Sequence, residues 1–191
     1  MSTEYPHRIP ETPQASVELL ERVVPPPNRP PLLYLAMAAN PEVLRAYVQG
    51  PILGLHGLLH TGQLAPAERE LCILRVTARS GAEHEWGVHV AYFGKTSGLP
   101  PAQVAATVTG EDAAEPWTPR QRAIVAVADA MVDMRELTDA ELAEIDGVLT
   151  VATRTEIVAI SAQYLGISAT CRALGIPPEP GAPRFPEPPA S

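Results

Sequence analysis

Apolar residues recur at helical spacing from residue 66 onward, on one face of a predicted helix. Pro66 suits a first helical position, where its missing N–H has no partner to lose, and Ser80-Gly81 suits an end. We therefore predict a helix over residues 66–79. Glu70 lies on its apolar face, beside Ile73, Leu74 and Thr77. Because burying an unpaired carboxylate costs several kcal/mol, we expect Glu70 to be partnered, hydrogen-bonded or protonated.

A second helix is predicted over residues 82–96, with Gly98 just past its end. This helix is apolar apart from one polar stripe, which consists of Glu85, His89, Tyr92 and Thr96. Gly87 and Gly94 lie on the opposite face. A glycine within a helix costs roughly 1 kcal/mol relative to alanine, so two aligned glycines predict another backbone close to this face.

An antiparallel pair of these two helices would bring Glu70 towards Glu85 and His89. Two carboxylates and an imidazole in an apolar setting push their pKa values apart, which supplies a general acid and a general base at neutral pH. A buried Glu–His pair that only ties the helices together is the alternative on geometry alone.

The same residues resemble a known family. Glu70, the run ELCILRV, the segment GAEHEW and His89 are similar to the carboxymuconolactone decarboxylase family, within the alkylhydroperoxidase D-like superfamily. His89 follows Glu70 by 19 residues, as in both branches of that superfamily, and the pattern E-x-E-W-x-x-H resembles the decarboxylase branch. Ala82 and Glu85 occupy the two positions of the cysteine pair of the peroxidase branch. His84 stands where the decarboxylase branch usually has tyrosine.

This resemblance implies an all-α, alkylhydroperoxidase D-like domain that self-associates, usually as a trimer or a hexamer. It also implies a cofactor-free enzyme that decarboxylates a small unsaturated lactone or keto acid, or isomerises or cyclises such a compound. In that reaction His89 is the candidate proton donor, Glu70 orients it or exchanges protons with it, and Glu85 tunes both. A thiol-dependent hydroperoxidase and a non-catalytic oligomeric small-molecule-binding protein are the alternatives.

Four further residues are candidates for substrate binding, and each has a plainer interpretation. Tyr92 lies on the polar stripe and Trp86 is next to it, although Trp86 is also a good core residue. His56 and His60 are four residues apart, a spacing typical of a pocket lining, a helix surface or two metal ligands. A metal set of these histidines with Glu70, Glu85 and His89 is a minority hypothesis, and we expect no metal. Tyr164 would line the pocket or lie in the core.

Proline divides the 191-residue chain into three parts. Of its 22 prolines, eight lie in residues 1–31 and seven in residues 175–191. We therefore predict an extended or disordered N-terminal arm over residues 1–30, a helical domain over 31–176 and a similar C-terminal tail over 177–191. A hydrophobic content of 46% suits one domain with a sizeable core.

The net charge and the lack of targeting signals indicate which classes of molecule this chain is expected to bind and in which compartment. A net charge of −8 without clusters of Lys and Arg disfavours nucleic acid and anionic membranes. The uncharged run 46–67 contains Gly-Pro, histidines and glutamines, which disfavours a membrane span, and no signal peptide is evident. Cys72 and Cys171 form no C-x-x-C motif and are expected to be buried. We expect a cytoplasmic protein that acts on a small molecule.

The remaining helices are predicted from their start signals. Asn40-Pro41 starts a helix towards His60 that is interrupted at Gly50-Pro51, and Pro100-Pro101 starts a short one. Capping boxes with threonine are predicted to start three more, at Thr118, Thr138 and Thr153. Because no strand alternation or hairpin signal emerges, the expected fold class is all-α.

Overall fold

A computed structural model describes residues 9–54, 56–110 and 117–186, and within these ranges it contains helices and no strand. The all-α prediction is therefore confirmed for the described part of the chain. The helices are α1 Gln14–Val23, α2 Leu32–Met37, α3 Pro41–Val48, α4 Leu58–Thr61, α5 Pro66–Arg79, α6 Glu83–Ser97, α7 Pro101–Thr109, α8 Pro119–Val132, α9 Asp139–Asp146 and α10 Val151–Leu174.

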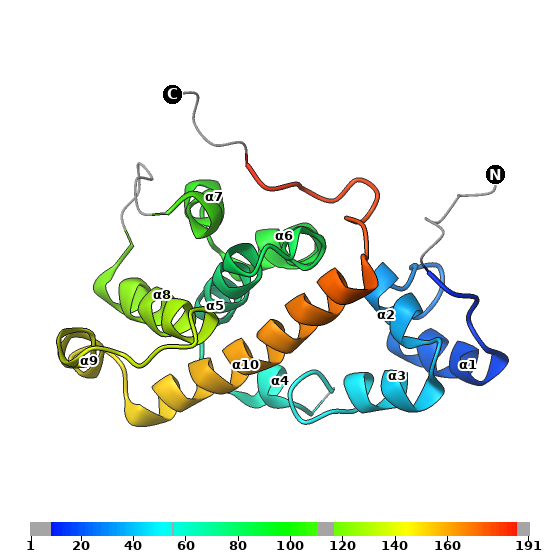
Figure 1. Cartoon of the computed structure of the whole chain (residues 1–191), viewed down its shortest axis with the longest axis horizontal. Coiled ribbons are helices and arrows are strands. Elements are labelled where there is room, and N and C mark those ends of the chain that lie inside the picture. Colours follow the sequence, from blue (N-terminus) through cyan, green and yellow to red (C-terminus); the bar gives the residue numbers. More distant parts are fainter. Residues whose placement is uncertain (1–8, 55, 111–116, 187–191) are drawn as a thin grey trace.

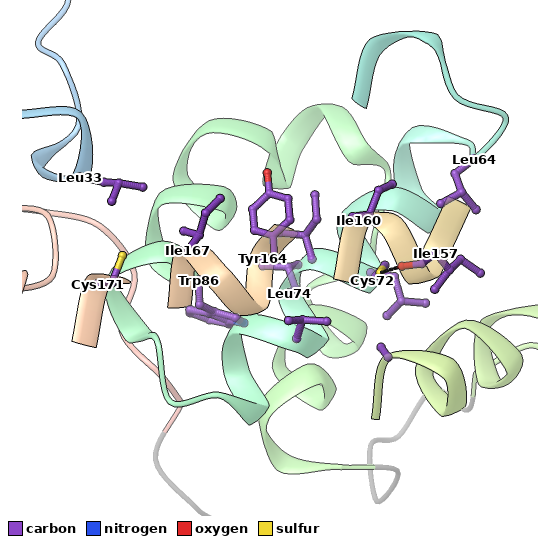
Figure 2. Packing of buried hydrophobic residues seen from close by; sticks show 14 of the residues in the cluster. Leu33, Leu64, Cys72, Leu74, Trp86, Ile157, Ile160, Tyr164, Ile167 and Cys171 are labelled. Carbon is purple, nitrogen blue, oxygen red and sulfur yellow. Dashed lines mark hydrogen bonds between the residues drawn. The ribbon is translucent and has the colours of Figure 1, made fainter. Parts of the chain in front are cut away.

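Helix α5 is the centre of the fold and packs against α6, α7, α8 and α10 (Figure 1). Its residues 70–77 are all buried, which explains why the helix carries apolar or paired side chains around its circumference. Helix α10 crosses the molecule diagonally, with α5 and α6 on one side of it and α1, α2 and α3 beyond its C-terminal half (Figure 1). Ile157, Ile160 and Ile167 of α10 and Leu74 of α5 belong to the shared core (Figure 2).

The helices begin and end at the glycines and threonine caps that the sequence predicts, except at the start of α10. Gly81 in the turn after α5 and Gly98 directly after α6 have φ of 66° and 80°, the left-handed backbone that glycine adopts without strain. The Thr118 and Thr138 side chains accept the N3 backbone N–H of their helices, as predicted. The prediction of a box at Thr153 is wrong, because Thr150 is the N-cap of α10 and its hydroxyl accepts the Thr153 N–H at 3.1 Å.

The N-terminal arm differs from the prediction of extended or disordered chain. Residues 14–23 form α1, which buries Leu19 and Leu20 and packs against α3, and the Ser16 hydroxyl donates to the Ala38 carbonyl at 2.7 Å. This local pattern of apolar residues outweighs the prolines that flank it. Residues 1–8 lie outside the described residues, and the domain boundaries themselves stay a prediction.

Described tail residues 177–186 contain no helix and run along α6. Arg184 pairs with Glu83 at 2.6 Å, and the Phe185 ring meets Trp86 edge-on at 5.4 Å. A Cβ on Gly87 would lie 2.5 Å from the Pro183 carbonyl oxygen, so the predicted close backbone approach is confirmed there. At Gly94 the prediction is wrong within the described chain, because the nearest atom to such a Cβ is the Val90 side chain at 3.7 Å.

Helix α10 is long and apolar enough to cross a membrane by length and composition alone. Its buried residues Ile157, Ile160 and Ile167 pack in the common core against α5 and α8. This packing is typical of a central core helix.

Candidate functional site

A cavity of about 540 Å³ opens where α5, α6 and α10 meet the N-terminal helices. Glu70 on α5, Glu85 and His89 on α6, and Tyr164 on α10 reach it from the core. Residues between Val23 and Tyr34, with Leu53 and with Leu59 and His60 of α4, line it on the other side. The cavity therefore lies between the predicted helix pair and a wall in which the sequence predicts only His60.

The structure brings Glu70, Glu85 and His89 together. The His89 Nδ1 lies 2.7 Å from the Glu70 Oε2, a hydrogen-bonding distance, and the His89 Nε2 lies 3.5 Å from the Glu85 Oε1. All three residues are buried, at 3 to 6% exposure. The antiparallel α5–α6 pair produces the first contact, and the i, i+4 spacing on α6 produces the second.

His89 is cationic at neutral pH in this arrangement. Burial alone would lower its pKa, but the hydrogen bonds and negative charges of Glu70 and Glu85 outweigh burial and raise the pKa to about 9. A group protonated at pH 7 and lining a cavity can donate a proton there. Its ring also contacts two aromatic rings, Phe93 at 5.2 Å and Tyr164 at 5.1 Å between centroids.

Two tyrosine hydroxyls add neutral donors to the cavity. Burial, reinforced by the charge of Glu85, raises the pKa of Tyr34. Burial and the charges of Glu85 and Glu70 raise the pKa of Tyr164 well above its usual range. Both side chains line the cavity and remain phenols at neutral pH, able to donate a hydrogen bond to a substrate oxygen.

Positive charge also reaches the cavity, although the chain is acidic overall. Arg29 and Arg69 both line it. The Arg69 Nη1 donates to the Leu59 carbonyl at 2.7 Å, and its Nε lies 3.6 Å from the Glu70 Oε1. A guanidinium has five N–H donors in a planar fork, so Arg69 keeps donors for a carboxylate after these contacts.

The four predicted substrate-binding residues fall into two groups. Tyr92 and His60 line the cavity, and Tyr92 is 60% exposed at its edge. Trp86 does not line it, because its side chain lies in the core, where the indole N–H donates to the Thr107 hydroxyl at 3.0 Å. His56 is exposed in a separate hollow with residues 48–51. The prediction of a shared pocket is thus wrong for Trp86 and His56.

Sequence reasoning missed Arg29, Tyr34 and Arg69 as cavity residues. Tyr34 is a lone polar group in an apolar helix, and Arg69 directly precedes Glu70, so each left a weak local signal. Arg29 lies in the proline-rich arm for which the sequence predicts extended or disordered chain, and only tertiary packing brings it to the cavity. The minority metal set also fails as a whole, since His56 lies apart from the other four residues.

The cysteines give no support to thiol chemistry at this site. Cys72 is fully buried, its Sγ lies 3.3 Å from the Ser161 hydroxyl, and burial raises the pKa of its thiol to about 12. Burial also raises the pKa of the Cys171 thiol. Both thiols are therefore poor nucleophiles at neutral pH.

Comparisons of the chain with family models, curated proteins and solved structures found no match.

Proposed function

We propose that this chain is an enzyme of the carboxymuconolactone decarboxylase type, with an alkylhydroperoxidase D-like helical fold. Its substrate would be a small unsaturated lactone acid or keto acid, and its own side chains would supply the acid and the base. The observation that carries this proposal is the position of His89 between the Glu70 and Glu85 carboxylates, at a cavity that Arg29 and Arg69 also line.

The arginines would select the substrate. The chain carries a net charge of −8, so an anionic compound needs a local positive region to enter. Arg29 and Arg69 lie with His60 at the cavity and offer planar donors that match a carboxylate. The apolar lining residues Leu33, Leu53 and Ile167 would contact the carbon skeleton.

Decarboxylation in this site would proceed through an enolate. The bond between the carboxylate and its carbon breaks, CO2 leaves, and the bonding electron pair moves through the unsaturation into the carbonyl. His89⁺ stabilises the developing negative charge and then delivers its proton to carbon. Glu70 holds the imidazole through Nδ1, while the 3.5 Å separation of Nε2 from Glu85 leaves that N–H available to substrate. Solvent would then restore the proton to His89 through Glu85.

The alternatives differ in what the same site would do. A hydroperoxidase needs a reactive thiolate with a resolving thiol, and the positions of that pair hold Ala82 and Glu85. A non-catalytic binding protein would use the cavity and its arginines without turnover. A proton-transfer isomerase would use His89 and Glu70 without loss of CO2.

Self-association is part of the proposal. Tyr92 and Phe93 are large apolar side chains on α6 that are 60% and 41% exposed, beside the cavity. A second copy that covers them would also close the cavity edge. Sedimentation of the full chain should show a trimer or a hexamer, and a monomer at all concentrations would remove this part of the proposal.

The function is tested with unsaturated lactone acids, β-keto acids and their methyl esters, with CO2 release and product formation both measured. The esters have no free carboxylate to lose, so an ester that turns over identifies isomerisation. We expect CO2 release from at least one acid, a loss of roughly a hundredfold or more in kcat/KM for His89→Ala, and no loss for the exposed control His56→Ala. Equal turnover by folded His89→Ala, or acid binding without turnover, would contradict the proposal.

A further inference from the structure

A second cluster of chemical groups lies beside the cavity. His84 and Glu85 on α6 and Cys171 on α10 place one donor atom each within 4.8 Å of one another, and all three residues are buried. Cys171 lies near the end of α10 (Figure 2). The cluster thus joins two helices with an imidazole, a carboxylate and a thiol.

His84 is oriented for ligand binding. Its Nδ1 lies 2.7 Å from the Pro177 carbonyl oxygen, which only accepts, so Nδ1 carries a proton and donates it. In the neutral ring Nε2 then carries a lone pair. This nitrogen is buried and has no hydrogen-bond partner in the described part of the chain. Metal-binding histidines are typically held this way, with the second ring nitrogen donating to a carbonyl or carboxylate.

A fourth oxygen ligand lies within reach. The Glu179 Oε1 is 4.0 Å from the His84 Nε2, and the same oxygen accepts the Leu32 backbone N–H. Its side chain is one-fifth exposed, whereas that of His84 is 2% exposed. Thus the buried part of the cluster has a nitrogen, a sulfur and the Glu85 carboxylate, and only the Glu179 carboxylate lies on its partly exposed side.

We propose that His84, Glu85, Cys171 and Glu179 together bind one divalent cation of the Zn²⁺ type. A mixed set of nitrogen, sulfur and carboxylate donors suits Zn²⁺, whereas Mg²⁺ and Ca²⁺ select oxygen. Metal–ligand lengths of about 2.0 to 2.3 Å place tetrahedral donors roughly 3.5 Å apart, so binding needs an inward movement of about 1 Å. Cys171 binds as the thiolate, and its proton passes to solvent.

The bound cation would connect the C-terminal segment to the helix pair. Pro177 and Glu179 belong to that segment, His84 to α6 and Cys171 to α10, so one ion would tie three parts of the fold. This role is structural, and the ion would share Glu85 with the proton-transfer site proposed for His89. It departs from the sequence-based expectation of no metal.

The test uses the full chain after dialysis against a chelator, with Zn²⁺ in calorimetry and Co²⁺ in absorption spectroscopy. We expect one Zn²⁺ per chain, a rise in melting temperature that chelator reverses, and a thiolate-to-cobalt charge-transfer band. Cys171→Ser should abolish the band, and His84→Gln should weaken Zn²⁺ binding roughly tenfold or more. Cys72→Ser and His56→Gln are matched controls that should leave binding unchanged.

Three results would overturn the proposal. They are absence of Zn²⁺ binding to the parent chain, Co²⁺ binding without a charge-transfer band, and Zn²⁺ affinity that is unchanged in Cys171→Ser and His84→Gln. Glu179→Gln provides a further readout if a buried variant fails to fold, because its partly exposed side chain can change without a core cavity, and it should weaken binding.

Discussion

Helix α5 presents a buried charged residue on each of two faces, and the two have different surroundings. Glu70 meets His89 beside the cavity, whereas Arg75 meets Asp129 of α8 away from it. The Arg75 Nε and Nη2 donate to the two Asp129 oxygens at 2.7 and 2.8 Å, and its Nη1 donates to the Thr107 carbonyl at 3.0 Å. Arg75 therefore pairs inside the chain and joins three helices, α5, α7 and α8.

These two pairs show that a buried ion pair is not by itself a sign of function. Arg75 uses its donors within the fold, where it joins α5 to α8, and it does not line the cavity beside His89. His89 has one firm bond through Nδ1, a longer contact through Nε2, and access to a cavity. The unused donor capacity and the access distinguish a site from a structural tie.

Arg75→Met should produce the largest loss of stability. It leaves Asp129 without its bidentate partner, and we expect the free energy of unfolding to fall by about 3 kcal/mol while turnover per folded molecule stays near parental. Urea unfolding and activity measurements check this. Arg79→Met is the control, because Arg79 pairs with Asp133 at a partly exposed position and should cost about 1 kcal/mol or less. Loss of turnover in folded Arg75→Met would contradict the claim that Arg75 has only a structural role.

The pH dependence of stability should differ between the Glu70–His89 pair and the Arg75–Asp129 pair. The pKa of His89 rises from 6.5 to about 9 on folding, so its stabilising effect is fully present below pH 6.5 and is lost as pH rises through 9. The stability difference between the parent and His89→Gln should therefore shrink, by on the order of 2 kcal/mol, between pH 6 and pH 10. Guanidinium groups do not titrate in this range, so the deficit of Arg75→Met should stay constant. Parallel pH curves for the parent and His89→Gln would refute the cationic state.

Glu85→Gln should have a smaller effect on activity, and it tests whether Glu85 raises the pKa of His89. Removing this carboxylate leaves the Glu70 hydrogen bond in place, so the pKa of His89 should fall but stay above 6.5. We expect kcat/KM to drop roughly tenfold, with its alkaline limb moved to lower pH. Glu83→Gln is a control on the same turn, since Glu83 faces Arg184 instead of the cavity. An unchanged pH profile would show that Glu85 does not act on His89.

Helix positions were largely predictable because their signals are local. Pro66, Ser80-Gly81 and Gly98 set the α5–α6 hairpin, and period and spacing then placed Glu70 and His89 in contact. Thr118 and Thr138 likewise act through side chains next to the backbone they cap. These features depend on neighbours within a few residues.

Features that depend on distant chain segments were missed. Trp86 is next to the polar stripe in sequence, but its contacts with Thr107 and Phe185 hold it in the core. Arg29 and the C-terminal segment reach their sites only through packing across the fold. The proline content of both arms predicted irregular chain and carried no information about the surfaces on which that chain packs.

The most direct test of the Glu70–His89 site is kcat/KM per folded molecule for Glu70→Gln, His89→Ala and the double variant. The two residues form one hydrogen-bonded unit, so each single change should cost roughly a hundredfold or more, and the double variant should cost about as much as either one. Thermal melts supply the folded fraction. Near-parental turnover in folded His89→Ala, or a double variant whose loss equals the product of the single losses, would contradict the account.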